Sequence, residues 1–127
     1  MSGHHEVLDQ LRSPTRQLRT AIPDVWSAFQ TVHRAAMADG VVPVRLKEAS
    51  ALAMSVVKRC DGCIAYHAKA AARAGASADE VAEMLGVALL LDGGTASVFA
   101  PRAWEAFMEF TGADDAGRPA DSALAGS

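Results

Sequence analysis

The sequence has few of the residues from which sheets, membrane spans and nucleic-acid-binding surfaces are built. Aromatic residues occupy 6% of its 127 positions, β-branched residues are sparse and alanine is abundant, which favours helix over sheet. The densest apolar run, residues 84–91, is far shorter than the roughly 18–20 residues of a membrane span. A net charge of −3 argues against a nucleic-acid binder, which normally carries a basic stripe. We therefore predict an all-α protein with no membrane and no nucleic-acid partner.

Cysteine is equally scarce, with two in the chain. The 50% apolar and 21% charged residues suit one compact globular domain. The first residues lack the basic-then-apolar layout of a signal peptide, so we expect a cytoplasmic protein. Because thiols are kept reduced in the cytoplasm, two cysteines there indicate redox chemistry or a metal more than a structural disulfide.

Hydrophobic spacing and helix-boundary residues predict six helices. They cover residues 6–20 (interrupted at Pro14), 24–38, 44–58, 60–74, 78–91 and 95–110 (bent at Pro101). Ser77 and Glu80 have the spacing of a capping box. The helix that ends near Leu91 becomes wholly apolar, which predicts burial on all sides. Residues 1–22 are an N-terminal helical extension, 23–111 the main domain, and the small, polar residues 112–127 a disordered tail.

Both cysteines lie in the segment from Cys60 to His67. Two thiols three residues apart can close a disulfide across one helical turn. If Cys60 starts a helix, the positive end of the helix dipole favours its thiolate, and the preceding Lys58 and Arg59 add positive charge. Cys63 and His67 are separated by four residues, which places thiol and imidazole on one helix face. Gly62 leaves room for a substrate or a partner sulfur to approach.

Three other interpretations of these residues stay open. The cysteines can be small core residues of an alanine-rich helix. Cys60, Cys63 and His67 can supply three zinc ligands with Glu48 as a fourth, although the sequence has no second half-site downstream. Glu48, at the edge of an apolar stripe, can be a solvated helix residue. The isolated His4, His5 and His33 are most simply surface or satisfied core residues, and Tyr66 a packing residue. Trp26, Trp104 and the phenylalanines are most simply core residues: Trp26 and Phe29 lie near one face of the helix at 24–38, and Trp104, Phe107 and Met108 face inward in the helix at 95–110.

The order Glu48, Cys60-x-x-Cys63, His67 resembles the alkylhydroperoxidase AhpD-like branch of the carboxymuconolactone decarboxylase family. The flanking pattern is similar too, with Lys47-Glu48-Ala49 opening a helix and Gly93-Gly94 after the apolar helix. The similarity covers about residues 23–110. Where the family often has histidine before the second cysteine, this chain has Gly62. The combined spacing is far more specific than a lone Cys-x-x-Cys, and it favours a redox role.

The resemblance implies an AhpD-like bundle that assembles into a homotrimer or homohexamer, with apolar helices buried between subunits. It also implies a thiol-dependent alkyl hydroperoxide reductase without metal or cofactor. Cys63 would attack the peroxide, Cys60 would form the redox-active disulfide with it, and His67 with Glu48 would relay protons. A dithiol reductant, such as a lipoylated or thioredoxin-like protein, would restore the thiols.

Three alternative functions remain on the sequence alone. The same thiols suit a disulfide-exchange or redox-sensing protein. The family's other chemistry, a carboxymuconolactone decarboxylase-type lyase, would leave the cysteines unexplained. A non-enzymatic helical assembly module would bury them in its core.

Overall fold

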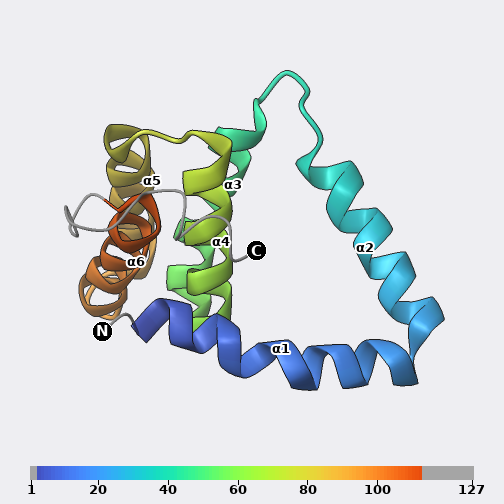
Figure 1. The fold of residues 1–127 in the computed structure, drawn as a ribbon. Coiled ribbons are helices and arrows are strands. Elements are labelled where there is room, and N and C mark those ends of the chain that lie inside the picture. Colours follow the sequence, from blue (N-terminus) through green and yellow to red (C-terminus); the bar gives the residue numbers. More distant parts are fainter. Residues whose placement is uncertain (1–2, 113–127) are drawn as a thin grey trace.

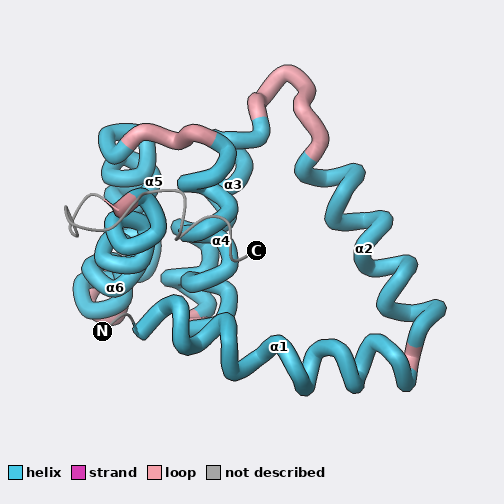
Figure 2. The backbone as a smooth tube through the Cα atoms, viewed as in Figure 1, coloured by secondary structure: helices cyan, strands magenta, loops and turns pink. Residues whose placement is uncertain are grey.

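The computed structural model of the protein describes residues 3–112, which form six helices and no strand (Figures 1 and 2). They are α1 (Gly3–Ala21), α2 (Pro23–Met37), α3 (Val44–Lys58), α4 (Asp61–Ala74), α5 (Ala78–Asp92) and α6 (Ala96–Thr111). The predicted all-α fold with six helices is therefore confirmed. The predicted disordered tail, residues 112–127, lies outside the described residues except for Gly112. No helix between residues 3 and 112 is long and apolar enough to cross a membrane.

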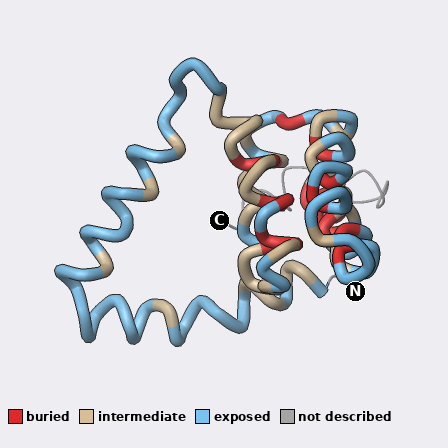
Figure 3. The backbone as a smooth tube through the Cα atoms, turned by 180° about the vertical axis from the view of Figure 1, so that it is seen from behind, coloured by how far each residue is buried: buried red, intermediate tan, exposed pale blue. Residues whose placement is uncertain are grey.

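A bundle of α3 to α6 contains the core (Figure 3). Its largest fully buried side chains are Phe107, Phe110, Leu52, Ile64, Val56 and Val81. Burying an apolar side chain of this size is worth about 1.5–3 kcal/mol, so these few residues supply much of the driving force for folding. The helices α3 and α4, which carry the candidate site, pack directly against each other and form a rigid base for it.

A tight turn reverses the chain between α3 and α4. Arg59 ends α3 in the left-handed conformation, with φ of 55°, which costs a non-glycine residue roughly 1 kcal/mol or more. Its backbone N–H donates to Val56 O at 3.1 Å, and the N–H of Cys60 donates to Ser55 O at 3.3 Å. These two bonds satisfy carbonyls at the end of α3 and place Cys60 at the start of α4.

The predicted boundary between α4 and α5 is present. Gly75 ends α4 with φ of 89°, a conformation that glycine adopts without steric cost. Glu80 N donates to Ser77 Oγ at 3.0 Å, and Ser77 N donates to Glu80 Oε1 at 3.0 Å. This reciprocal pair is the capping box that the sequence predicts, and it fixes where α5 begins.

The helix α1 is continuous, so the predicted interruption at Pro14 is wrong. Pro14 is exposed, and water can satisfy the carbonyl that loses its helical partner. The first turn of α1 is held to α6, because His5 N donates to the buried carboxylate of Glu109 at 3.0 Å and His4 Nε2 lies 3.1 Å from Glu105 Oε1. The rest of α1 runs along one end of the bundle and continues beyond it (Figure 1).

Two predicted burial patterns are wrong for the single chain. The end of α5 is not buried on all sides, since Leu90 and Leu91 are 81% and 77% exposed. The helix α2 has no buried residue, and its Phe29 is exposed while Trp26 is only half-buried. Figure 1 shows why: α2 stands apart from the bundle and returns to α3 through a loop. In α6, Phe107 is buried as predicted, and Trp104 and Met108 pack against the core from its edge.

Candidate functional site

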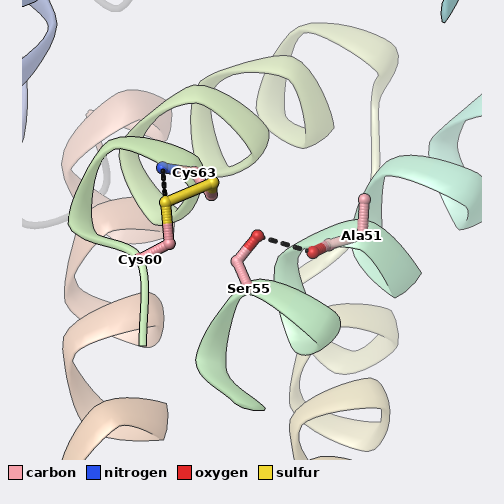
Figure 4. The surroundings of a disulfide bond; sticks show 4 residues. All are labelled: Ala51, Ser55, Cys60 and Cys63. Carbon is pink, nitrogen blue, oxygen red and sulfur yellow. Dashed lines mark hydrogen bonds between the residues drawn. A yellow bond between two sulfur atoms is a disulfide. The ribbon is translucent and has the colours of Figure 1, made fainter. Parts of the chain in front are cut away.

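The two cysteines form a disulfide at the start of α4 (Figure 4). Their Cα atoms are 5.2 Å apart, which is within the usual range for disulfides. Cys60 is the N-cap residue of α4, and its Sγ accepts a hydrogen bond from Cys63 N at 3.2 Å. Both side chains are half-buried, so the interpretation of the cysteines as inert core residues is wrong. In the reduced state, the N-cap hydrogen bond and the helix dipole stabilise a thiolate at Cys60.

Beneath the disulfide, Ser55 closes the end of α3. Its hydroxyl donates to Ala51 O at 2.7 Å (Figure 4), and its own carbonyl accepts from Cys60 N. Ser55 is buried, and its hydroxyl proton is already committed to the backbone. This arrangement anchors the turn that carries Cys60.

The Glu48 carboxylate and the His67 imidazole form a close pair between α3 and α4. Glu48 Oε1 and His67 Nδ1 are 2.7 Å apart, and the two side chains are 6% and 20% exposed. Because a carboxylate only accepts hydrogen bonds, Nδ1 carries the hydrogen, which leaves Nε2 as the basic nitrogen of a neutral ring. Glu48 is therefore no solvated helix residue: it is buried and holds His67 in one orientation and one tautomer.

Sequence reasoning missed a second imidazole and a phenol beside this pair. The Tyr66 hydroxyl lies 3.4 Å from His33 Nε2 on α2, and its ring packs edge-on against His67 with centroids 5.0 Å apart. The pKa of Tyr66 is above its ordinary value, first because of burial and then because of the negative charge on Glu48. No sequence pattern predicts that α2 turns His33 toward α4; only the order Tyr66-His67 was visible.

Of two sequence expectations about the surroundings of the cysteines, one agrees with the structure and one is wrong. Gly62 lines a cavity together with both cysteines, and a side chain at this position would meet Leu11 Cδ1 of α1 at 3.0 Å. Arg59 does not direct its charge at Cys60, because its guanidinium donates to the Asp92 carboxylate of α5 at 3.2 and 3.4 Å. The helix start therefore remains a source of positive potential at the sulfurs, and Arg59 does not add to it.

The candidate zinc ligands do not assemble into a metal site. Within residues 3–112 there is no group of three or more His, Cys, Asp or Glu side chains arranged to hold a metal ion. The two sulfurs bond to each other, and the Glu48 carboxylate bonds to the nitrogen Nδ1 of His67. The described geometry thus gives a dithiol–disulfide pair next to an acid–base pair.

Comparison with known proteins identifies the family. The model of the carboxymuconolactone decarboxylase family matches residues 23–116, which is most of the chain. The chain belongs to the carboxymuconolactone decarboxylase family. Its α3–α4 region, with Glu48 and the cysteine pair, lies inside the matched range, and the AhpD-like branch indicated by the motif is consistent with this membership.

Two curated proteins and one solved structure are similar to the chain. An uncharacterised protein of Cupriavidus necator is 38% identical over 86 residues, which is 68% of this chain and 76% of that protein. Uncharacterized protein 4 in the cox locus of Paracoccus denitrificans is 34% identical over 86 residues, covering 68% of this chain and 78% of the relative. The crystal structure of apo-lpg0406, a carboxymuconolactone decarboxylase family protein from Legionella pneumophila, superposes with a TM-score of 0.83 and 30% identity, covering 86% of this chain and 97% of that chain.

In this carboxymuconolactone decarboxylase family member, the cysteines open onto a cavity of about 570 Å³. The start of α4 contributes Cys60, Gly62 and Cys63, and the next turn contributes Tyr66 and His67. The other walls come from α1 and α2. The cavity volume is in the range of small-molecule binding sites, so a compact substrate can reach the sulfurs and the imidazole together.

Proposed function

We propose that the protein is a thiol-dependent alkyl hydroperoxide reductase. The observation that carries this proposal is the shared cavity: both cysteines and His67 line it, while buried Glu48 holds His67 from behind. A peroxide in this cavity would meet a sulfur nucleophile and a proton donor at the same time. The family includes enzymes but does not distinguish an oxidoreductase from a lyase, and the thiol–imidazole geometry supports the oxidoreductase.

The first step oxidises Cys63. Its thiolate attacks one peroxide oxygen, the O–O bond breaks, and Cys63 becomes a sulfenic acid while the alkoxide leaves and takes a proton to become an alcohol. The two electrons of the new S–O bond come from the thiolate. Cys63 has this role because its spacing from His67 places thiol and imidazole on one face of α4.

The second step closes the disulfide. The Cys60 thiolate attacks the Cys63 sulfenic sulfur, an S–S bond forms, and hydroxide leaves as water after taking a proton. The Cys60–Cys63 disulfide in the structure corresponds to the product of this step. Cys60 suits the attack because the N-cap position stabilises its thiolate without a separate base.

Proton transfer in the first step is assigned to His67, and the hydroxide released in the second step takes its proton from solvent. Nε2 accepts the proton of the Cys63 thiol and returns it to the departing alkoxide. The Glu48 carboxylate stabilises the imidazolium through Nδ1, because a charge-assisted hydrogen bond is about twice as strong as a neutral one. Glu48 is thus a positioning residue that acts through His67.

An external dithiol completes the cycle. It reduces the Cys60–Cys63 disulfide by thiol exchange and leaves as a disulfide, so each turnover consumes one hydroperoxide and one dithiol. A lipoylated or thioredoxin-like protein in the cytoplasm would supply the electrons. A redox sensor or disulfide-exchange protein would use the same thiols but would not react quickly with peroxide.

Turnover of cumene hydroperoxide with excess dithiothreitol tests the proposal. Wild-type protein is expected to consume the peroxide, and Cys63→Ser is expected to abolish turnover. Cys60→Ser should retain one rapid oxidation of Cys63, seen as a sulfenic acid by mass spectrometry. Oxidation of the wild-type thiols no faster than free cysteine would replace this proposal with the redox-exchange function. Depletion of carboxymuconolactone by the Cys60→Ser/Cys63→Ser variant would replace it with the lyase.

We also propose that copies of this chain assemble into a homotrimer or homohexamer. The end of α5 exposes Val87, Leu90 and Leu91, and a further apolar cavity of about 450 Å³ lies between α5 and α6. A second copy of the chain packed there would bury the apolar helix that the single chain leaves exposed. Light scattering of the wild type and of Leu90→Glu tests this: the variant should dissociate, and a monomeric wild type would contradict the assembly.

A further inference from the structure

The cavity above the cysteines has an apolar part. Trp26 and Phe29 of α2 and Leu11 of α1 line it. Phe29 is 60% exposed, and the Trp26 and Phe29 rings lie edge-to-face with centroids 6.2 Å apart. Two aromatic rings in a cavity of about 570 Å³ favour a ligand with a flat or aliphatic body larger than hydrogen peroxide itself.

The charges around the same cavity are of one sign. Arg19 of α1 and Arg34 of α2 line it, and no aspartate or glutamate does, although the chain as a whole has a net charge of −3. An adjoining cavity of about 320 Å³ adds Arg12 and Arg16 to Arg19, again without a lining carboxylate, although Arg12 is paired with Asp9 at 3.2 Å. The access to the cysteines is therefore more positive than the rest of the molecule, which attracts anions.

The two lining guanidiniums are available to a ligand. Within residues 3–112, neither Arg19 nor Arg34 forms an ion pair with a carboxylate, and Arg34 donates only to the hydroxyl of Thr31 on its own helix, at 3.2 Å. By contrast, Arg45 and Arg59 of the bundle are paired with Glu80 and Asp92. A guanidinium binds a carboxylate through two parallel hydrogen bonds, a geometry that lysine cannot reproduce.

We propose that the natural substrate is an organic hydroperoxide that carries a carboxylate on an apolar, preferably aromatic, body. This inference rests on the proposed peroxidase function and deepens it. The carboxylate binds the guanidinium of Arg19 or of Arg34, the body packs on Trp26 and Phe29, and the peroxide end reaches Cys63. The chemistry at the sulfur is unchanged, so the arginines set which peroxide is used and not whether peroxide is reduced.

A matched pair of substrates tests the proposal. The carboxylate 4-(2-hydroperoxypropan-2-yl)benzoate and its methyl ester have the same reacting group and differ in charge. The wild-type protein is expected to show a higher kcat/KM for the carboxylate. Since an exposed ion pair changes an equilibrium by about two- to fivefold, Arg19→Gln/Arg34→Gln should lower that preference by about the same factor. The preference should also weaken with added salt.

A variant elsewhere provides the control for lost charge. Arg102→Gln removes one guanidinium from α6, where Arg102 lies over the Phe99 ring at 5.2 Å, and it should keep the wild-type preference. An unchanged preference in Arg19→Gln/Arg34→Gln, or a wild-type preference for the ester, would overturn the proposal. The proposal would also be overturned if the double variant keeps its preference for the carboxylate but its disulfide is reduced more slowly by an acidic dithiol protein. The arginines would then bind the reducing partner.

A binding measurement separates this proposal from the peroxidase function. In a Trp104→Phe background, Trp26 is the remaining tryptophan and its fluorescence reports ligand in the cavity. Titration with unreactive 4-isopropylbenzoate should change the fluorescence, whereas neutral 4-isopropylbenzamide should bind more weakly. If no hydroperoxide is consumed but 4-isopropylbenzoate binds and Arg19→Gln/Arg34→Gln weakens that binding, the peroxidase function is refuted and the carboxylate-binding site is supported. Equal binding of both compounds would overturn the anion site.

Discussion

Replacing Glu48 by glutamine should slow oxidation of the reduced protein without unfolding it. The amide has the shape of the carboxylate and can still accept from His67 Nδ1 at 2.7 Å, but the bond loses its charge. A hydrogen bond to a charged group is worth about 1.5–3 kcal/mol against about 0.5–1.5 kcal/mol for a neutral one. The difference, about 1–1.5 kcal/mol, is the support that the imidazolium loses.

Because about 1.4 kcal/mol corresponds to tenfold in an equilibrium or a rate, the second-order rate constant for oxidation by cumene hydroperoxide should fall about tenfold. Stopped-flow measurement of thiol loss at pH 7 gives this constant. Glu48→Leu should have a larger effect and should also destabilise the fold, since it leaves a half-buried imidazole nitrogen without an acceptor, a cost of about 1–3 kcal/mol.

Glu83→Gln makes the same chemical change at an exposed position of α5 and should oxidise at the wild-type rate. Urea denaturation of each variant distinguishes a loss of function from a loss of folded protein. If Glu48→Gln oxidises as fast as the wild type while remaining folded, the Glu48–His67 pair has no part in proton transfer, and its contribution is to packing alone.

Three further predictions concern the fold around the site. Gly62→Ala should change the free energy of unfolding little, because a gain of about 1 kcal/mol in helix propensity is offset by close contact with Leu11 Cδ1. In a Leu11→Ala background, which removes this contact, Gly62→Ala should stabilise the protein. Equal effects of Gly62→Ala in both backgrounds would refute the contact. Glu109→Gln should speed hydrogen exchange in residues 3–21, since the variant loses the charged acceptor for His5 N, and an unchanged rate would mean that α1 is held by other contacts. Backbone N–H donation from Ser77 lowers the pKa of Glu80 below its ordinary 4.5. The ionised Glu80 carboxylate therefore stabilises the fold above pH 4.5, and this stabilisation is lost as the pH falls through the lower pKa of the folded state. In that pH window, the melting temperature of Glu80→Gln should depend less on pH than that of the wild type.

The local features of this fold were predictable because their causes are local. The helix starts at Pro23 and Ser77 and the helix end at Gly75 follow from backbone chemistry within a few residues. The spacing of Glu48, Cys60, Cys63 and His67 was equally visible, because α3 and α4 are adjacent and joined by a tight turn. Their assembly into one site required only that these two helices pack together.

The features that the sequence did not reveal depend on long-range contacts. The sequence around Gly62 does not indicate that a methyl group of Leu11 lies beside it, and the sequence around His33 does not indicate that His33 approaches Tyr66. The apolar stripe of α2 has helical spacing but is not buried against any part of residues 3–112, so burial could not be inferred from periodicity. Pro14 was misjudged for a related reason: whether proline interrupts a helix depends on whether the freed carbonyl faces water.

The sulfur of Cys60 has the place in α4 that serine or aspartate usually has at the start of a helix. Redox state and helix initiation are therefore thermodynamically linked through one atom. Any stabilisation that the helix start gives to the thiolate is withdrawn when the disulfide forms, so the oxidised protein has a greater tendency to accept electrons than an unconstrained disulfide would. The amide of Cys63, which donates to that sulfur, becomes a natural reporter of the oxidation state, and its hydrogen-exchange rate should differ between the reduced and the oxidised protein.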